Sequence, residues 1–159
     1  MPDGAGVPIR CYTVSVFAIA RNAGSPKLLL MRRADTLAGC WCQVAGKIEK
    51  DETAWQAALR ELREETGLVA ETLYHADIFE RFYEPEKDVI TIVPVFVTSF
   101  EEIPDISLND EHDAFRWVSF DEGMDLVSFS GQRRVLTEIK SDFVDRTPDP
   151  HHLIELKRP

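Results

Sequence analysis

Residues 46–68 read GKIEKDETAWQAALRELREETGL, and this stretch constrains the structure more than any other part of the 159-residue chain. Thr53 and Gln56 have the spacing of a capping box, in which the threonine caps a helix and the glutamine reaches back to it. Alanine and leucine residues that favour helix follow, and Gly67 ends the run as a helix-terminating glycine. The pattern predicts a helix from about residue 54 to residue 65.

One face of this helix is expected to be acidic. At roughly 100° per residue, Glu61, Glu64 and Glu65 share one face, while Leu62 lies on the neighbouring face and should enter the core. Like charges four positions apart destabilise an isolated helix, and a bound cation would remove that cost. Clustered carboxylates of this kind suit a hard divalent ion such as Mg2+, with Mn2+ as an alternative.

The glycine, glutamate and arginine residues of the stretch follow the spacing G-x5-E-x7-R-E-U-x-E-E-x-G-U, where U is aliphatic. Every specified position is met, from Gly46 and Glu52 to Leu68. The hexapeptide RELREE alone would usually be a solvated helix face. The full pattern, however, resembles the Nudix hydrolases, enzymes that cleave a diphosphate linked to another group. The resemblance implies an α/β fold, an α/β/α sandwich with a mixed β-sheet, over roughly residues 9–144.

The resemblance also implies roles within the pattern. Metal ligands are expected at the carbonyl of Gly46 and at the carboxylates of Glu61, Glu64 and Glu65. Glu52 would support this cluster, and Arg60 would orient a glutamate through a bidentate pair without contacting the substrate. A non-catalytic, nucleotide-sensing Nudix module is the alternative from a different class. Such domains typically lose one of the glutamates, and none is lost here.

A further acidic candidate lies outside the pattern, at Glu111 in the segment EHDAFRW, residues 111–117. An E-H pair followed by a short strand with Arg and Trp resembles Nudix subgroups that act on triphosphates and on dinucleoside polyphosphates. In those subgroups a loop glutamate reaches the metal site, so Glu111 is a candidate metal ligand and general base. Glu61 is the other candidate for activating the attacking water, and the sequence leaves the choice open.

Three residues ahead of the pattern are candidates for substrate binding. Arg32 and Arg33 end an expected strand, at a place where related enzymes present cations to phosphate. Trp41 either stacks on a base or packs against the helix, and both interpretations stay open.

The amino-acid sequence from Arg33 to Gly46, together with Gln132 and Arg133, resembles the dihydroneopterin triphosphate or dATP pyrophosphohydrolase group. In that group the products are a monophosphate and pyrophosphate, so the expected substrate is a small nucleotide or pterin polyphosphate. The chain departs at two places from the sequence that is usual in this group: Ala45 replaces a common glycine, and Lys50-Asp51 replaces the usual Pro and Gly before Glu52. A diadenosine polyphosphate hydrolase is the alternative, since it shares the EHxxxRW element, although its usual Pro-Pro-Lys-Gly segment is absent.

Length and composition favour a single domain over residues 1–159, with a Pro-containing tail from residue 147. The net charge of −10 argues against a nucleic-acid-binding surface. No apolar run approaches the length of a membrane span, so no membrane association is expected. The three cysteines lack the spacing of a disulfide framework or zinc site, which indicates a reducing cytoplasm. Many relatives pair as dimers, and a homodimer is an option that the sequence leaves open.

The rest of the chain is expected to supply the sheet and the second helical layer. A hairpin is predicted from strands at 10–20 and 27–33, and further strands at 41–45, 72–83, 89–100 and 114–118. Pro94 implies a bulge or an edge position in its strand. Helices are predicted at 122–127 and from 130 to about 142.

Overall fold

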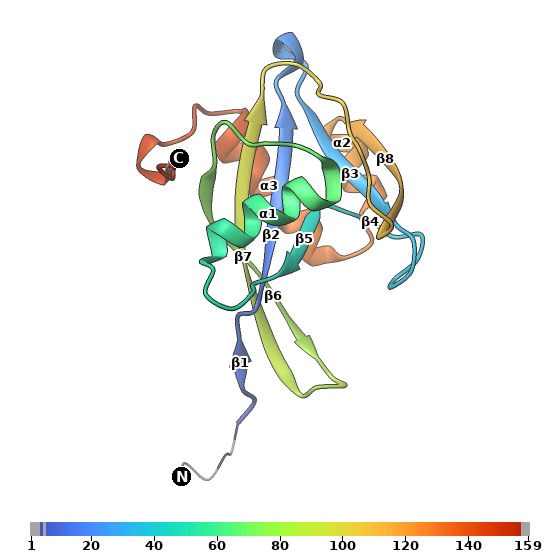
Figure 1. The fold of residues 1–159 in the computed structure, drawn as a ribbon, viewed down its shortest axis with the longest axis vertical. Helices are drawn as coiled ribbons and strands as arrows, with labels where there is room; N and C mark the ends of the chain where they lie inside the picture. The colour runs from blue at the N-terminus through green and yellow to red at the C-terminus, as the bar shows by residue number, and fades with distance from the viewer. Residues whose placement is uncertain (1–3, 5, 157–159) are drawn as a thin grey trace.

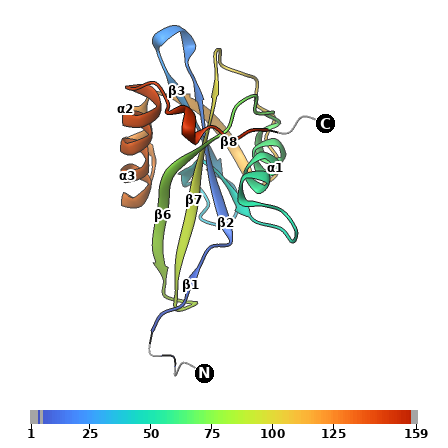
Figure 2. The ribbon, with the colours of Figure 1, turned by 90° about the vertical axis from the view of Figure 1, so that its left-hand side faces the viewer.

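The computed structural model describes residues 4 and 6–156, and its centre is an eight-stranded mixed sheet (Figure 1). Helix α1 covers one face of the sheet, and helices α2 and α3 cover the other (Figure 2). The strands are β1 (Ile9–Arg10), β2 (Thr13–Ala20), β3 (Lys27–Arg33), β4 (Trp41–Cys42), β5 (Val44–Lys47), β6 (Tyr74–Glu84), β7 (Val89–Phe100) and β8 (His112–Val118). The helices are α1 (Ala54–Thr66), α2 (Phe120–Leu126) and α3 (Ser130–Ile139). The expected α/β/α sandwich is confirmed.

Two apolar cores hold these layers together, because alternate residues of a strand point to opposite faces of the sheet. In β2, Val14 and Val16 pack in the core beneath α1, together with Leu62 of the helix. Phe17 and Ile19 of the same strand pack in the core beneath α2 and α3, with Leu136. The nearly continuous apolar sequence of β2 therefore serves both cores at once.

The hairpin predicted from the first two long strands is present only at its tip. Strands β2 and β3 pair at Ile19 with Leu28 and at Ala20 with Lys27, and then diverge. The segment 41–47 fills the space between them, as β4 pairs with β3 and β5 pairs with β2. The predicted strand at 41–45 is thus two short strands, interrupted at Gln43. The divergence makes room for β5, which lies against α1.

Strand β7 is central, as expected from its apolar sequence. It pairs in parallel with β1 and β2 and antiparallel with β6. Pro94 lies between the part of β7 that pairs with β1, up to Thr91, and the part that pairs with β2, from Val95. The bulge falls on the partner strand, between His75 and Phe79 of β6. Asp77 within it has a positive φ of 56°.

Several element boundaries differ from the sequence prediction. The first predicted strand is divided into β1 and β2, and the strand predicted from residue 114 begins at residue 112. Helix α2 begins at Phe120, two residues earlier than predicted, because Ser119 caps it by accepting a hydrogen bond from the Glu122 N–H. Helix α3 ends at Ile139 and continues as one turn of π-helix, Lys140–Val144.

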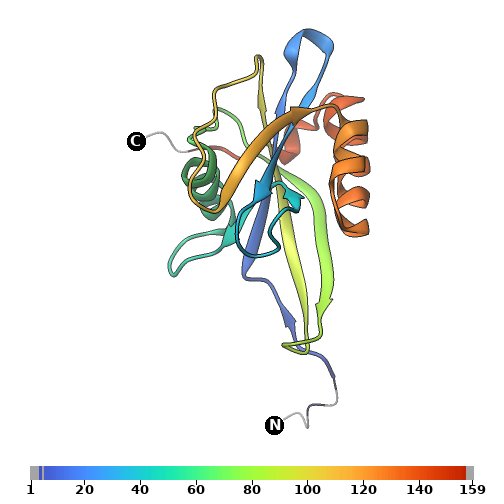
Figure 3. The ribbon, with the colours of Figure 1, turned by 90° about the vertical axis from the view of Figure 1, so that its right-hand side faces the viewer.

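Two irregular segments pack against the α1 side. The loop that joins β7 to β8 runs beside α1 (Figure 3), and its Ser107 N–H donates to the Thr66 carbonyl at the end of that helix. In the tail, the 3-10 turn Pro150–His152 leads to Ile154, whose N–H donates to the Leu73 carbonyl. Both contacts tie chain segments that are distant in sequence to the layer that carries the acidic helix.

Candidate active site

Helix α1 is positioned by its apolar face. Leu62 is 0% exposed, and Ala57 and Ala58 are small enough to bring the helix close to the sheet. The predicted capping box is formed, since the Gln56 N–H donates to the Thr53 hydroxyl and the Thr53 N–H donates to the Gln56 side chain. This placement buries Glu61 and Glu65, at 8% and 1% exposure, between α1 and the sheet.

Gly46 allows the closest approach between the sheet and these carboxylates. A Cβ atom at this position would lie 2.0 Å from the carboxyl carbon of Glu61, far inside van der Waals contact. Any side chain at residue 46 would therefore displace the glutamate. The glycine of the sequence pattern is required here for space, and it brings the β5 backbone directly against the acidic face of α1.

Arg60 ties the acidic groups of the region together. It forms the expected bidentate pair with Glu52, through Nε–Oε2 at 3.1 Å and Nη2–Oε1 at 2.7 Å. Its Nη1 also donates to Glu61 at 2.8 Å and to Glu64 at 3.2 Å, and its Nη2 donates to the Lys47 carbonyl. The arginine thus fixes the loop before α1 to the helix. The hydrogen bonds from Arg60 lower the pKa of Glu52.

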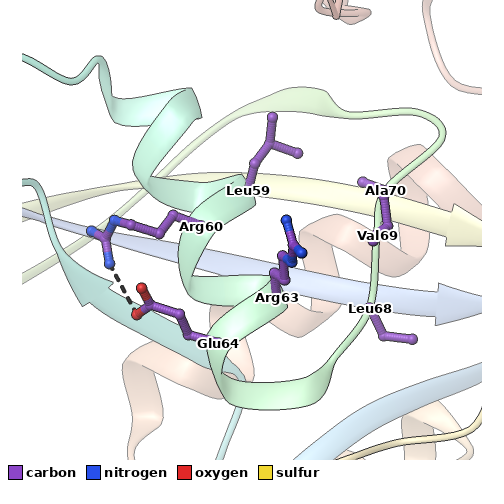
Figure 4. A pocket seen from close by; sticks show the side chains of 7 residues that line it. All are labelled: Leu59, Arg60, Arg63, Glu64, Leu68, Val69 and Ala70. Atoms are coloured by element: carbon purple, nitrogen blue, oxygen red, sulfur yellow. Dashed lines mark hydrogen bonds and ion pairs between the residues drawn. The ribbon is translucent and has the colours of Figure 1, made fainter. Parts of the chain in front are cut away.

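Glu64 lies on the outer side of the helix. Figure 4 shows Arg60 and Glu64 facing one another along α1, next to a hollow of about 660 Å³ between the helix and residues 68–70. This hollow is lined mainly by aliphatic groups and the two ends of that ion pair. Of the three glutamates predicted to share a face, Glu61 and Glu65 point inward and Glu64 is half exposed at the rim.

Glu65 has the most perturbed surroundings of the three. Among the described residues, neither of its buried carboxylate oxygens has a hydrogen-bond partner. Burial, together with the negative charges of Glu111 and Glu61, raises the pKa of Glu65 to about 9. The Ala45 N–H opposes this rise without completing a hydrogen bond. A buried carboxylate without a partner is strongly disfavoured, so this position calls for a proton or a cation.

Glu111 reaches the same place from the β7–β8 loop. Its carbonyl accepts a hydrogen bond from the Ala34 N–H, and its own N–H contacts the Asn109 side chain. The Glu111 side chain is exposed, yet its charge raises the pKa of Glu65 and, after burial and Glu64, that of Glu61. The structure therefore brings Glu111 together with the helix glutamates, more than forty residues away in sequence.

The three residues predicted to bind substrate, Arg32, Arg33 and Trp41, have different surroundings in the structure. The Arg32 Nε donates to Asp113 at 2.6 Å, and its guanidinium lies 6.0 Å from the ring centre of Trp41. Arg33 instead lies near Glu65, where its charge lowers that pKa. Trp41 is half-buried, packs against the core beneath α2 and α3, and also lines a pocket. Trp41 therefore packs against the core on the far side of the sheet from α1, and its stacking on a base stays a prediction.

A pocket of about 640 Å³ lies beside β4 and β5 and is also lined by residues of β2, β6 and the start of α3. Arg33 and Gly46 line its wall, so it lies next to the acidic face of α1. Glu80 of β6 also lines this pocket and was not among the functional residues predicted from the sequence. Burial raises the pKa of Glu80 to about 7 despite a hydrogen bond from Ser15. The only signal in the sequence was a charged residue two positions from the apolar residues Ile78 and Phe82, which resembles any solvated strand position.

His112, next to Glu111, is buried rather than free to contact a substrate. Its Nε2 lies 3.6 Å from the Cys42 sulfur, and burial lowers its pKa. Burial likewise raises the pKa of the Cys42 thiol to about 12. These two residues form a neutral packing contact under the loop that carries Glu111.

The acidic residues fit a hard divalent cation. Within residues 4 and 6–156, no three Asp, Glu, His or Cys side chains are already arranged as a complete metal site. Arg60 currently holds one oxygen each of Glu61 and Glu64. The unpartnered oxygens of Glu65 and the surrounding carboxylates nevertheless form an all-oxygen donor set, which suits Mg2+ or Mn2+.

Residues 11–139 match the family described as the NUDIX domain. The chain belongs to this family. Its members are hydrolases that act on phosphoanhydrides, and this Nudix hydrolase has the family's fold and complete sequence pattern. None of the helices in the described part of the chain is long and apolar enough to span a membrane.

Two curated relatives illustrate the sequence similarity. The bis(5'-nucleosyl)-tetraphosphatase (asymmetrical) of Rattus norvegicus is 30% identical over 114 residues, which cover 70% of this chain and 77% of that protein. A protein named octanoyltransferase from Myxococcus xanthus is 32% identical over 126 residues, covering 78% of this chain. This Nudix hydrolase spans only 35% of the length of that second protein.

Solved structures show the same fold. The Ap4A hydrolase of C. elegans in a binary complex superimposes with a TM-score of 0.73 at 21% identity, covering 84% of this chain and 98% of that one. The dihydroneopterin triphosphate pyrophosphohydrolase of E. coli gives a TM-score of 0.72 at 20% identity, with 89% and 100% covered. At these identities the likeness extends to the fold alone.

Proposed function

We propose that this Nudix hydrolase cleaves a phosphoanhydride bond of a nucleoside triphosphate or pterin triphosphate, with the help of Mg2+, to give a monophosphate and pyrophosphate. The observation that carries the proposal is Glu65, whose two carboxylate oxygens are buried without a hydrogen-bond partner among the described residues. It lies beside Glu61 and Glu111, next to a pocket large enough for a base. A divalent ion at this position would convert an acidic cluster into a phosphate site.

Glu61, Glu64, Glu65 and Glu111, with the Gly46 carbonyl, are the residues that would hold the ion. When bound, it would neutralise phosphate oxygens and lower the pKa of an attacking water. Arg60 keeps the helix and the preceding loop in register through Glu52 and the Lys47 carbonyl. It therefore positions the carboxylates and leaves phosphate contact to other cations.

Glu111 is the proposed general base, with Glu61 as the alternative. The Glu111 carboxylate is exposed and can accept a proton from water, whereas Arg60 already donates to Glu61 at 2.8 Å. Arg33 is the better placed of the two predicted arginines to contact phosphate, because it lies near Glu65 and lines the pocket. Arg32 is engaged by Asp113 and supports Trp41.

A second candidate function is hydrolysis of dinucleoside polyphosphates. The 30% identity to the bis(5'-nucleosyl)-tetraphosphatase of Rattus norvegicus favours it. In addition, Phe82 and Tyr83 are exposed at the rim of the pocket and offer aromatic faces that a second base could contact. The absence of a Pro-Pro-Lys-Gly segment before the acidic helix weighs against this candidate.

A substrate panel with Mg2+ separates the candidates. It should contain canonical and oxidised dNTPs, dihydroneopterin triphosphate, diadenosine tetraphosphate and ADP-ribose, with products identified by chromatography. Release of pyrophosphate from a triphosphate, at a higher kcat/KM than cleavage of the dinucleotide, supports the first function. Preference for diadenosine tetraphosphate supports the second. Failure to hydrolyse any of these substrates with either Mg2+ or Mn2+ would contradict both.

A further inference from the structure

The pocket beside the acidic helix contains a polar network that the chemistry at α1 does not use. Its members come from four separate segments of the chain. They are Ser15 of β2, Gln43 between β4 and β5, Glu80 of β6 and Gln132 of α3. All four line the pocket, and Ser15, Gln43 and Gln132 are buried.

Hydrogen bonds orient this network in one direction. The Phe129 N–H donates to the Gln132 side-chain oxygen, and the Gln132 amide donates to the Gln43 oxygen at 3.4 Å. The Gln43 amide in turn donates to Glu80 Oε1 at 2.9 Å and to the Ser15 hydroxyl at 2.9 Å. Ser15 also donates to Glu80 Oε1, at 3.3 Å. The chain of donors therefore ends at one oxygen of Glu80.

The other oxygen, Glu80 Oε2, takes part in no hydrogen bond between described residues and is not enclosed by protein atoms. No ion pair within residues 4 and 6–156 involves this carboxylate. When ionised, a carboxylate held in this way offers only an acceptor to the pocket. Such an acceptor, partly shielded from water, favours ligands that present N–H donors and disfavours ligands that present lone pairs.

The neighbouring side chains indicate the shape of the ligand. Trp41, Phe82, Tyr83 and Phe129 line the same pocket, and aromatic faces of this kind stack on flat heterocycles. A 2-amino-4-oxo heterocycle, as in guanine or a pterin, is flat and places a ring N–H beside an exocyclic amino group. Adenine instead places a ring lone pair beside its amino group, and hypoxanthine lacks the amino group.

We propose that Glu80 is a specificity residue, whose free carboxylate oxygen accepts hydrogen bonds from the ring N–H and 2-amino group of a guanine or pterin. The inference rests on the proposed function, because it assigns this pocket to the base of the substrate. It also narrows that function, since it selects substrates with a 2-amino-4-oxo edge over adenine nucleotides. Gln43 and Ser15 position the carboxylate, and they do not themselves select the base.

Binding of nucleosides tests this role without any hydrolysis. Affinities for guanosine, inosine, adenosine and neopterin would be measured by NMR titration at pH 8 in the presence of a chelator. Guanosine and inosine differ only in the 2-amino group, so their ratio isolates the proposed contact. The wild type should bind guanosine at least tenfold tighter than inosine and adenosine. Comparison of guanosine with neopterin then distinguishes a purine from a pterin ligand.

Glu80→Gln keeps the size of the side chain and removes the carboxylate. We expect the guanosine-to-inosine ratio to fall to less than one third of its wild-type value, and Glu80→Ala to show the same loss. Asp77→Asn is the matched control, because it is an exposed acid on the same strand and should leave the ratio unchanged. In turnover assays, Glu80→Gln should raise KM for the preferred triphosphate and leave kcat within about threefold.

Three results would overturn the proposal: absence of measurable nucleoside binding, a wild-type ratio below ten, or a ratio that survives Glu80→Gln. None of these depends on a metal or on an anhydride bond, because the probes lack phosphates. Failure of the base-recognition role is therefore distinguishable from failure of the proposed hydrolytic function, which the substrate panel tests separately.

Discussion

Glu65 on α1 and Glu80 on β6 are both carboxylates withdrawn from water, but their surroundings are opposite. Glu65 has no hydrogen-bond partner among the described residues and faces the like charges of Glu61 and Glu111. Glu80 receives hydrogen bonds from Gln43 and Ser15, and burial is the largest cause of its raised pKa. We expect a divalent cation to complete the first environment. Hydrogen bonds from the protein already support the second carboxylate, which we propose accepts hydrogen bonds from a neutral ligand.

The contrast between Glu65 and Glu80 predicts that hydrolysis takes place on the α1 side of the sheet. Activity should depend strictly on a divalent cation, and Glu65→Gln should lower turnover by at least about 100-fold, because a lost ligand leaves phosphate charge uncompensated. Steady-state turnover at saturating Mg2+ measures this effect, with circular dichroism to verify the fold. Near-wild-type turnover of a folded Gln variant would remove Glu65 from the metal site.

The next largest effect is expected at Glu111. Glu111→Gln should lower turnover by roughly 10- to 1000-fold, since a general base contributes about 10²–10⁴. The free energy of unfolding should change by less than about 0.5 kcal/mol, because the side chain is an exposed loop acid. Both quantities can be measured on one preparation by steady-state kinetics and urea denaturation.

Asp110→Asn is the control for that variant, as it changes an adjacent acid in the same loop. Asp113 is unsuitable, because it pairs with Arg32 at 2.6 Å. If Glu111→Gln and Asp110→Asn have equal activity, Glu111 is an ordinary loop residue. The base would then be sought first at Glu61.

Leu62 tests the apolar face of the same helix. Leu62→Ala should destabilise the protein by roughly 2–4 kcal/mol, because the leucine is 0% exposed in the core beneath α1. Urea denaturation measures the change, and Leu59→Ala, at a partly buried position on the same helix, provides a milder comparison. A denaturation midpoint that hardly moves would show that α1 is not held to the sheet through this face.

The smallest effect is a pH dependence on the β6 side. Glu80 has a folded pKa of about 7 against an ordinary value of 4.5, so the folded state retains a proton that the unfolded state loses. Between about pH 4.5 and pH 7 the unfolded state therefore binds fewer protons, and the free energy of unfolding falls as the pH rises. Glu80→Gln removes this contribution.

The difference in unfolding free energy between wild type and Glu80→Gln should change by roughly 1–3 kcal/mol from pH 5 to pH 8, in the direction that favours the variant at high pH. Urea denaturation of both proteins at the two pH values measures it. Glu65 titrates alike in both proteins and cancels. Parallel pH profiles would mean that Glu80 keeps contact with water in the folded state.

The sequence alone determined helix α1 and the composition of its faces. Its cap, its C-terminal glycine and the spacing of Leu62 and the glutamates are local features, and a helix fixes which residues share a face within one or two turns. The alternation of apolar residues likewise predicted most of the sheet. Only the resemblance to a family, and no spacing rule, directed attention to Glu111.

The tertiary structure decided what those residues meet. The sequence of β2 and β3 predicts a simple hairpin, but the two strands diverge, and β4 and β5 fill the gap. These two short strands line the pocket together with β2, β6 and the start of α3. The sequence predicts a solvent-facing strand residue at Glu80, whereas in the fold Gln43 and Ser15 donate hydrogen bonds to its carboxylate. The physical reason is that burial and charge depend on contacts between segments far apart in the chain, and these contacts set the protonation and the hydrogen bonding of a carboxylate.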